Sequence, residues 1–319
     1  MTDKTRMKVI LLGRGQMLAN IIEAARESDV EIAGVFRYER TLFSGVKLFF
    51  NDLFKTSYDL TLIKKYKLPE VKCKSANSED FRNYILKTNA DLIMVGTWRE
   101  KLKKETFSMP RIGTVNIHPS LLPRYRGPNP YMQVILNGEK KTGVTLHLMD
   151  ENIDTGAILL QKEVDILPSD TGKELRERAF SATRELAREF LVKIQSEVII
   201  PITQNESRSS YFGNVDEMIK MLDFKNNTSE EIVRIIKALH PWMPCYLTVG
   251  SHFLKVNPYK VKIEEQQTDI PAGYIIDKNP KSKSLTVVCK DGKALKMDDL
   301  KLWWIFIRPF TNIFIQFFC

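Results

Sequence analysis

The chain has 319 residues, of which 43% are hydrophobic and 27% charged, and its net charge is +9. This length favours two domains over one, and the composition is ordinary for a soluble protein. The four cysteines are far apart and form no Cys-x-x-Cys pair, so we expect reduced thiols in a cytoplasmic protein, which excludes a disulfide framework or a zinc site. The N-terminal stretch MTDKTRMKVILLG lacks the long apolar region of a signal peptide.

Short apolar runs alternate with helical patterns in the first 200 residues. The runs predict strands at 8–12, 31–36, 91–95, 113–117, 142–149 and 157–164, with a weak one at 71–73. Helices are predicted at 15–28, at 78–87 with Ser78 as N-cap, and at 171–194. This alternation is typical of an α/β fold with a Rossmann-like, doubly wound, mostly parallel sheet. In such sheets ligands bind beyond the carboxyl ends of the strands.

The remainder of the chain has a different character. After the polar stretch 201–213, a helix is predicted at 228–239, followed by short strands at 246–249, 253–256, 273–276, 284–289, 294–297 and 302–307. Many short strands between turn residues predict a small β-barrel-like, OB-like domain. We therefore predict a catalytic domain at 1–200, a linker at 201–213 and a β-rich domain at 214–319.

The tail 302–319 holds twelve large apolar residues among eighteen. It is at the lower limit of length for crossing a bilayer and is interrupted by Arg308, Pro309, Asn312 and Gln316. We expect barrel strands, or a strand whose partner lies elsewhere, and not a membrane anchor; an interface or a membrane contact are the alternatives.

Positive charge is concentrated in two segments. Residues 37–74 carry nine Lys/Arg against four Asp/Glu, and residues 99–126 carry seven against two. Both segments follow predicted strands, so the charge should form a rim around the crevice. Clustered charge of one sign speeds the capture of an oppositely charged ligand, which predicts a polyanionic substrate.

Three polar residues near the middle of the chain suggest acyl-transfer chemistry. Asn116 lies on a strand that leads into His118, and Asp154 lies in a turn closed by Gly156. The amide can donate to an oxyanion, the imidazole can donate to the same oxygen or move a proton, and the carboxylate can orient the imidazole or accept a proton through water. No serine or cysteine nucleophile accompanies them, so the attacking group should belong to the substrate. The alternative is that Asn116 and Asp154 cap turns and His118 belongs to the core.

Two further patterns predict absences. Gly13-Arg14-Gly15 begins a dinucleotide fingerprint, but Leu18 stands where its third glycine belongs, so we expect a tight turn and no NAD. The histidines at 147, 240 and 252 are isolated, without metal-ligand spacing, so we expect no metal.

The segments NIHPSLLPRYRG and GVTLHLMDENIDTGAILLQ resemble the 10-formyltetrahydrofolate-dependent formyltransferase family. That family includes methionyl-tRNA, glycinamide ribonucleotide and amino-sugar formyltransferases. The similarity covers residues 7 to about 200 and continues through LDFKNNTSEEIVRIIKALHPW, as in the longer methionyl-tRNA and amino-sugar enzymes. The resemblance implies an N-formyltransferase that moves a formyl group from 10-formyltetrahydrofolate to a primary amine, with Asn116, His118 and Asp154 as its catalytic residues.

The same resemblance implies binding residues. Those for the folate co-substrate are Met94, Gly96, Trp98, Ser120, Leu121, Leu122, Met149, Asp150 and Ile153. For the acceptor we predict Arg14, Arg37, Arg124, Tyr125, Arg126 and Gly127.

Methionyl-tRNA is the acceptor that we favour, because two domains and a basic rim suit a large RNA. In residues 201–319, however, Lys/Arg exceed Asp/Glu only by 16 to 13. A nucleotide-linked amino sugar is the alternative, since FRYERTLFSGVKLFFNDLFK is more aromatic than the corresponding loop of the tRNA enzymes. A formyl-folate hydrolase and a non-catalytic binding protein are further alternatives.

Overall fold

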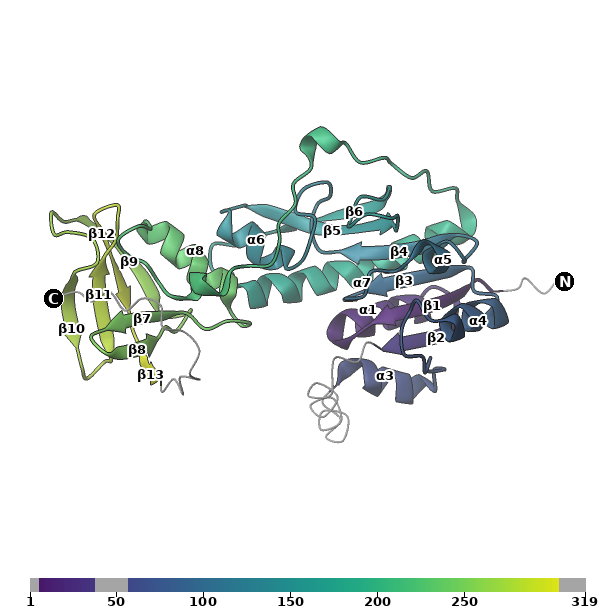
Figure 1. The fold of residues 1–319 in the computed structure, drawn as a ribbon, viewed down its shortest axis with the longest axis horizontal. Helices are drawn as coiled ribbons and strands as arrows, with labels where there is room; N and C mark the ends of the chain where they lie inside the picture. Colours follow the sequence, from purple (N-terminus) through teal and green to yellow (C-terminus); the bar gives the residue numbers. More distant parts are fainter. Residues whose placement is uncertain (1–5, 38–56, 304–319) are drawn as a thin grey trace. The chain divides into compact units, whose positions relative to one another are not determined.

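A computed structural model describes residues 6–37 and 57–303. The chain divides into two compact units (Figure 1). Unit 1 consists of Met1–Pro130, Lys141–Asp165 and Arg176–Gly213, and unit 2 of Tyr131–Lys140, Ile166–Leu175 and Asn214–Cys319. Unit 1 therefore continues to Gly213, beyond the catalytic domain predicted at 1–200.

Unit 1 is built on one six-stranded sheet with the order β2-β1-β3-β4-β5-β6. Its strands are β1 (Lys8–Gly13), β2 (Glu31–Arg37), β3 (Leu92–Gly96), β4 (Gly113–His118), β5 (Lys141–Leu148) and β6 (Ile158–Asp165). The pairs among β1 to β4 are parallel, and β5 and β6 add antiparallel neighbours. The predicted α/β fold with a mostly parallel sheet is confirmed.

The helices described between β1 and residue 200 are α1 (Gly15–Arg26), α3 (Tyr58–Tyr66), α4 (Glu79–Thr88), α5 (Lys104–Phe107), α6 (Pro130–Leu136) and α7 (Gly172–Ser196). Of these, α6 from Tyr131 on and the start of α7, up to Leu175, belong to unit 2. Ser78 caps α4 as predicted, since its hydroxyl accepts the N–H of Phe81. The weak strand predicted at 71–73 is wrong, because the backbone there makes only an isolated bridge between Val35 and Glu70. Helices α3, α5 and α6 were not predicted.

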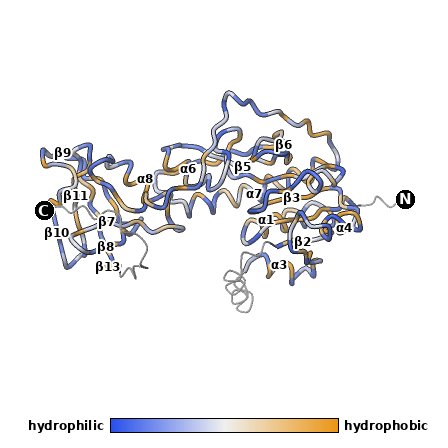
Figure 2. The backbone as a smooth tube through the Cα atoms, in the orientation of Figure 1, coloured by the Kyte–Doolittle hydropathy of each residue, from blue (hydrophilic) through white to orange (hydrophobic). Residues whose placement is uncertain are grey.

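The core of unit 1 is formed by apolar side chains of this sheet and of the helices that pack on it. All five residues of β3 are buried, and the buried strand residues pack against α4 through Phe81 and Ile85. Figure 2 shows hydrophobic colouring along the central strands. Strands buried on both faces read as continuous apolar runs, which is why β1 and β3 were recognisable in the sequence.

The register of β4 and β5 fixes which side chains stand together at the sheet's centre. Asn116 lies opposite His147, and His118 lies opposite Thr145. Directly opposed residues of an antiparallel pair have side chains on the same face, so this register places His147 beside Asn116.

The N-terminus of α1 carries a negative charge from elsewhere in the chain. The carboxylate of Asp59, which is fully buried, accepts the backbone N–H of Gly15 at 3.0 Å and the Nε–H of Arg37 at 3.2 Å. An acidic group at this end of a helix is stabilised by the helix dipole. These contacts lower the pKa of Asp59, although its burial acts to raise it.

Unit 2 contains α8 (Ser229–Leu239) and two antiparallel sheets among the described residues. The sheet β10-β11-β12-β9 has β9 (Val261–Gln267), β10 (Ile275–Asn279), β11 (Ser284–Val288) and β12 (Lys293–Met297). The sheet β13-β8-β7 has β7 (Tyr246–Val249), β8 (His252–Lys255) and β13 (Lys301–Trp303). The predicted β-rich character is confirmed, and the one strand that the sequence did not indicate is β9.

Local sequence explains α8. Thr228 and Glu231 form a capping box, and the apolar face of the helix packs into the core of unit 2 with Leu285 and Leu295. Residues 304–319, most of the predicted apolar tail, lie outside the described residues. Among the helices that the structure describes, none has the length and hydrophobicity needed to span a bilayer.

Candidate active site

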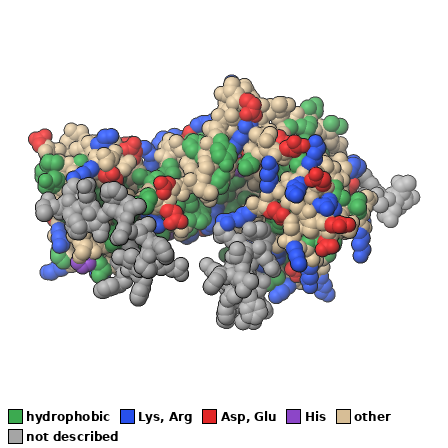
Figure 3. All heavy atoms as spheres, viewed as in Figure 1, with side chains coloured by type: hydrophobic (Ala, Val, Ile, Leu, Met, Phe, Trp, Pro, Cys, Tyr) green, Lys and Arg blue, Asp and Glu red, His purple; other side chains and the backbone are tan. Residues whose placement is uncertain are grey.

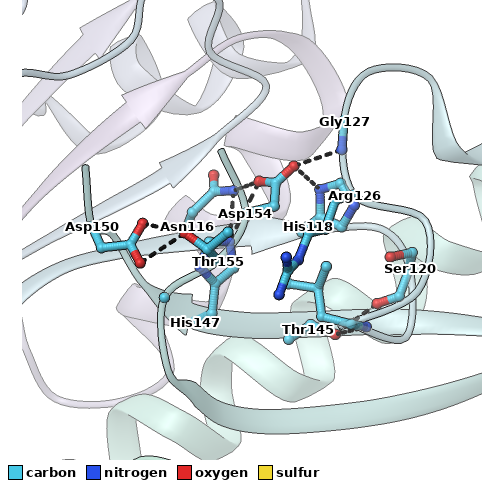
Figure 4. Close-up of polar contacts among 12 residues, drawn as sticks. Asn116, His118, Ser120, Arg126, Gly127, Thr145, His147, Asp150, Asp154 and Thr155 are labelled. Carbon is cyan, nitrogen blue, oxygen red and sulfur yellow. Dashed lines mark hydrogen bonds and ion pairs between the residues drawn. The ribbon is translucent and has the colours of Figure 1, made fainter. Parts of the chain in front are cut away.

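The carboxyl end of β4 and the β5–β6 connection meet at a partly buried polar cluster in unit 1. Asn116 and His118 come from β4, and Asp154 comes from the connection (Figure 4). The Nδ2 atom of Asn116 is 3.3 Å from Oδ1 of Asp154, and Nδ1 of His118 is 3.5 Å from Oδ2 of Asp154. The structure thus brings together three residues that the sequence separates by up to 38 positions.

Asp154 is the centre of this cluster. Its backbone is left-handed, with a φ of 57°, and its side chain is 11% exposed. Burial acts to raise its pKa, but the His147 contact, the charge of His118 and the backbone N–H of Gly127, 2.9 Å from Oδ2, lower it to about 2. The carboxylate is therefore ionised at neutral pH and is a poor proton acceptor there.

His118 presents one nitrogen to Asp154. Its Nε2 lies 2.8 Å from the carbonyl oxygen of Tyr125, and because a carbonyl can only accept, Nε2 carries a proton. In the neutral imidazole Nδ1 is then unprotonated and faces the carboxylate. Burial lowers the pKa of His118, although the charge of Asp154 opposes this shift. The neutral ring can accept a proton at Nδ1, and the resulting cation would be paired with Asp154.

A fourth residue, His147, belongs to the same cluster. Its Nδ1 lies 2.8 Å from the carbonyl oxygen of Leu148, so Nδ1 carries a proton, and in the neutral ring Nε2 is then an acceptor. The Nδ2 of Asn116 lies 3.1 Å from this Nε2. The two N–H groups of the Asn116 amide thus point to His147 and Asp154. Donation to an oxyanion requires Asn116 to exchange the longer bond, the one to Asp154.

Sequence reasoning treated His147 as isolated. The signal that could have located it is the strand alternation of GVTLHLM together with the pairing of β5 on β4. Neither a motif nor a spacing identifies such a residue, because its partner is chosen by register.

The residues predicted to bind the folate differ in how far they are exposed. Met94 is fully buried in β3, and Ser120 is fully buried with its hydroxyl donating to the carbonyl of Arg124. Asp150 accepts from the hydroxyl of Thr155 and from the N–H of Asn152. Ile153, beside Asp154, is 50% exposed.

The remaining predicted folate residues are parts of the same loops and strand ends. Gly96 ends β3, and the ring of Trp98 packs against that of Phe36 at 5.2 Å. Leu121 and Leu122 lie in the loop after β4, and Met149 follows β5 and packs on the core. The folate assignments stay a prediction.

The predicted acceptor residues are mostly engaged within the protein. Arg37 pairs with Asp59, and Tyr125 is buried with its ring stacked on Phe212 at 4.9 Å. Arg126 is 6% exposed, and its guanidinium contacts Gln204 and Glu206. The other three are Arg14, which precedes α1, Arg124, whose guanidinium lies over the Tyr125 ring, and Gly127, which donates its N–H to Asp154.

The predicted positive rim is partly neutralised. In the second basic segment, Lys104 pairs with Glu151 and Arg111 pairs with Asp91. On the face of unit 1 drawn in Figure 3, basic and acidic side chains are interspersed. Residues 38–56 of the first basic segment lie outside the described residues.

The arrangement suits addition of an amine to a carbonyl carbon. An amide donor stands beside a buried imidazole that can take a proton, and a carboxylate stabilises the resulting cation. No serine or cysteine side chain bonds to His118 among the contacts of the described residues, as expected where the nucleophile belongs to the substrate.

Comparison with known proteins finds matches over most of the chain. Residues 6–191 match the model of a family described as formyl transferase, and residues 215–302 match the formyl transferase C-terminal domain. A methionyl-tRNA formyltransferase from Halothermothrix orenii is 34% identical over 230 residues, which are 71% of this chain and 72% of that protein. One from Clostridioides difficile is 29% identical over 298 residues, 93% and 90% of the two chains.

Solved structures share the fold. An N-formyltransferase from Helicobacter canadensis, in complex with folinic acid and dTDP-3-aminofucose, matches with a TM-score of 0.66 at 20% identity. The match covers 92% of this chain and 99% of that one.

Proposed function

Because this chain belongs to the formyl transferase family, we propose that it transfers the formyl group of 10-formyltetrahydrofolate to the amino group of methionyl-tRNA. The chain is an N-formyltransferase. The observation that carries the proposal is the meeting of Asn116, His118 and Asp154 at one partly buried point, in a chain whose matched relatives are named methionyl-tRNA formyltransferases.

The surroundings of the cluster fit a folate. A pterin is flat, with polar edges and apolar faces, and binding sites for such groups combine apolar side chains with a few polar ones. Ile153 exposes an apolar side chain next to Asp154, and Leu121 and Leu122 lie in the loop that follows β4. These residues, with those predicted above, would hold the folate, which supplies an activated formyl carbon.

The chain's own residues then stabilise the charge on one oxygen and accept one proton. As the amine adds to the formyl carbon, negative charge develops on the oxygen, and Asn116 can donate an N–H to it. The amine nitrogen gains positive charge, and its proton can pass to Nδ1 of His118, directly or through water. The protonated imidazole is stabilised by Asp154 at 3.5 Å and stays anchored through Nε2 to the carbonyl of Tyr125. When the adduct collapses, the bond between the formyl carbon and the folate nitrogen breaks, and that nitrogen leaves with the proton that His118 accepted, as tetrahydrofolate. We therefore assign proton acceptance and its return to His118, and charge stabilisation to Asp154.

The acceptor is the part of the proposal that a direct assay must decide. Purified full-length protein is incubated with 10-formyltetrahydrofolate and, in parallel, with methionine-charged initiator tRNA, uncharged tRNA, a dTDP-linked amino sugar, or buffer. We expect formylmethionyl-tRNA, detected by mass spectrometry after release of the amino acid, and no product with uncharged tRNA, which lacks the amine.

Each other outcome overturns a part of the proposal. Preferential formylation of the amino sugar would replace the acceptor. Formate release that is equally fast without an amine would indicate hydrolysis. A steep fall in kcat/KM with added salt is expected for tRNA, because every phosphate contact releases counterions. Because the four separated cysteines indicate reduced thiols, we expect the protein to act in the cytoplasm.

A further inference from the structure

The stretch that follows α7 is packed against the active site. Residues 204–212, which we name the closing segment, belong to unit 1 and include the short 3-10 helix η1 (Glu206–Arg208). Their sequence, QNESRSSYF, is polar, and the sequence analysis placed them in a linker. In the structure the segment bonds to the turn that carries Asp154 and to the loop that follows β4.

Gln204 connects the closing segment to the turn of Asp154. Gln204 is only 6% exposed, and its Nε2 donates to the carbonyl of Asp154 at 2.9 Å and to that of Gly156 at 2.8 Å. Its Oε1 accepts from Arg126 at 2.8 Å and 3.2 Å. Every polar group of this buried amide is therefore used, and a satisfied buried network of this kind specifies one geometry.

Arg126 holds Gln204 in place. Its guanidinium forms a bidentate pair with Glu206, with nitrogen–oxygen distances of 2.7 and 2.9 Å, while also donating to Gln204. The planar guanidinium is suited to such two-point contacts and fixes the partners' orientation. The guanidinium of Arg126 bonds to groups within the protein. We therefore assign Arg126 to holding Gln204 in place and not to binding the acceptor.

A second set of bonds connects the closing segment to His118. The N–H of Arg126 donates to the carbonyl of Ser210, and the N–H of Phe212 donates to the carbonyl of Arg126. Tyr125 donates its N–H to the Ser210 hydroxyl and stacks its ring on Phe212. The carbonyl of Tyr125 is the acceptor for His118 Nε2. The segment thus sets the position of the group that selects the His118 tautomer.

Both supported loops contain a strained residue. Asp154 and Tyr125 have φ values of 57° and 60°, in the left-handed region. For a residue with a Cβ atom this conformation is unfavourable and persists where surrounding contacts impose it. For Asp154, the backbone carbonyl contact comes from Gln204; for Tyr125, the contacts come from Ser210 and Phe212. The strain lies next to the chemistry, and the closing segment maintains it.

We propose that Gln204 is a positioning residue for the transfer reaction: it fixes the Asp154 turn so that the carboxylate meets Nδ1 of His118. This inference rests on the proposed function, because it concerns the same proton transfer. Gln204 does not touch the reacting atoms and acts through the backbone of Asp154 and Gly156.

The test compares three full-length variants with the unchanged protein. Gln204→Met keeps the length of the side chain and removes the donors. Gln204→Glu keeps an acceptor for Arg126 and places an oxygen against two carbonyls. Asn205→Ala is the matched control, because Asn205 is the next residue, is exposed and bonds only within its own turn. Kinetics are measured with whichever amine the unchanged protein formylates, and folding is checked by thermal melting.

A displaced catalytic group costs on the order of 10²-fold in rate, so we expect kcat of both Gln204 variants to fall by about that factor. The KM values for donor and acceptor should stay within about 3-fold, because ground-state contacts are kept. Asn205→Ala should keep kcat within about 2-fold, since it removes only exposed bonds. The acid limb of the kcat profile of Gln204→Met, measured at saturating amine, should move to lower pH, because Asp154 no longer raises the pKa of His118.

The outcomes separate this inference from the proposed function. If the unchanged protein formylates no amine, the proposed function fails. If it does, and a folded Gln204 variant keeps kcat within about 3-fold of it, the positioning role is refuted. A loss of kcat with an unmoved acid limb would also overturn it, because a loss of folded enzyme lowers the rate without changing the pH profile. Should Gln204→Met not fold, Gln204→Glu decides by its kcat.

Discussion

Replacing Asp154 by asparagine isolates the charge of the carboxylate from its shape. Asparagine keeps an oxygen that can accept the N–H of Gly127, so the turn should be retained. What is lost is the attraction between the carboxylate and a protonated His118. At the observed 3.5 Å, two unit charges interact by roughly 5 kcal/mol at an effective dielectric constant of about 20.

This energy sets the expected loss of rate. Each 1.36 kcal/mol is about tenfold in rate, so full loss of the pair would correspond to a little over 10³-fold. Positioned acid–base groups contribute about 10² to 10⁴-fold, which brackets the same value. We expect kcat/KM of Asp154→Asn to fall about 10³-fold.

The assay is formyl transfer to the amine that the unchanged protein accepts, with thermal melting as the measure of folding. Glu163→Gln is the matched control, because Glu163 is an exposed carboxylate on β6 whose pair with Lys141 is worth at most about 1 kcal/mol. A folded Asp154→Asn enzyme with kcat/KM within about 5-fold of the unchanged protein would refute the role of the carboxylate.

Three more predictions follow from the geometry. Burial lowers the pKa of His118, and the neutral ring is the active form. With the amine saturating, so that titration of the free amine does not enter, kcat should be at its plateau at neutral pH and fall only below about pH 6.5; a fall of kcat above that value contradicts the assignment. His147→Ala should lower kcat about tenfold, because Asn116 loses the acceptor that orients its amide; unchanged turnover would remove His147 from the site. Thr228→Ala breaks the capping box of α8 and should lower the free energy of unfolding by about 1 kcal/mol, measured by denaturant titration; Thr228→Ser should restore it.

The fold could be predicted because its signals are local. The apolar runs of β1 and β3 and the capping residues Ser78 and Thr228 identify elements by composition alone. The strand β9 was missed because its sequence, VKIEEQQ, has only two apolar residues, which contact the core while the rest face water. A strand at the edge of its sheet needs less apolar content than a central one.

The site could be predicted only as far as side-chain chemistry reveals it. Asn116, His118 and Asp154 are residue types with recognisable chemistry at strand ends. His147 depends on the pairing register, and Gln204 bonds to backbone carbonyls, which leave no trace in residue type. Contacts of this kind are decided by tertiary geometry. The roles of the site residues are predictions that the experiments above address.

The buried carboxylate of Asp59 has a consequence for how this architecture is used. Many α/β proteins seat a pyrophosphate where the first strand turns into the first helix, since the unbonded amides there attract anions. In this protein the Asp59 side chain occupies that position: it accepts the N–H of Gly15 and forms an ion pair with Arg37. An incoming phosphate would meet the Asp59 carboxylate at this helix end. The residues that we assign to catalysis lie two strands away across the sheet, at β4.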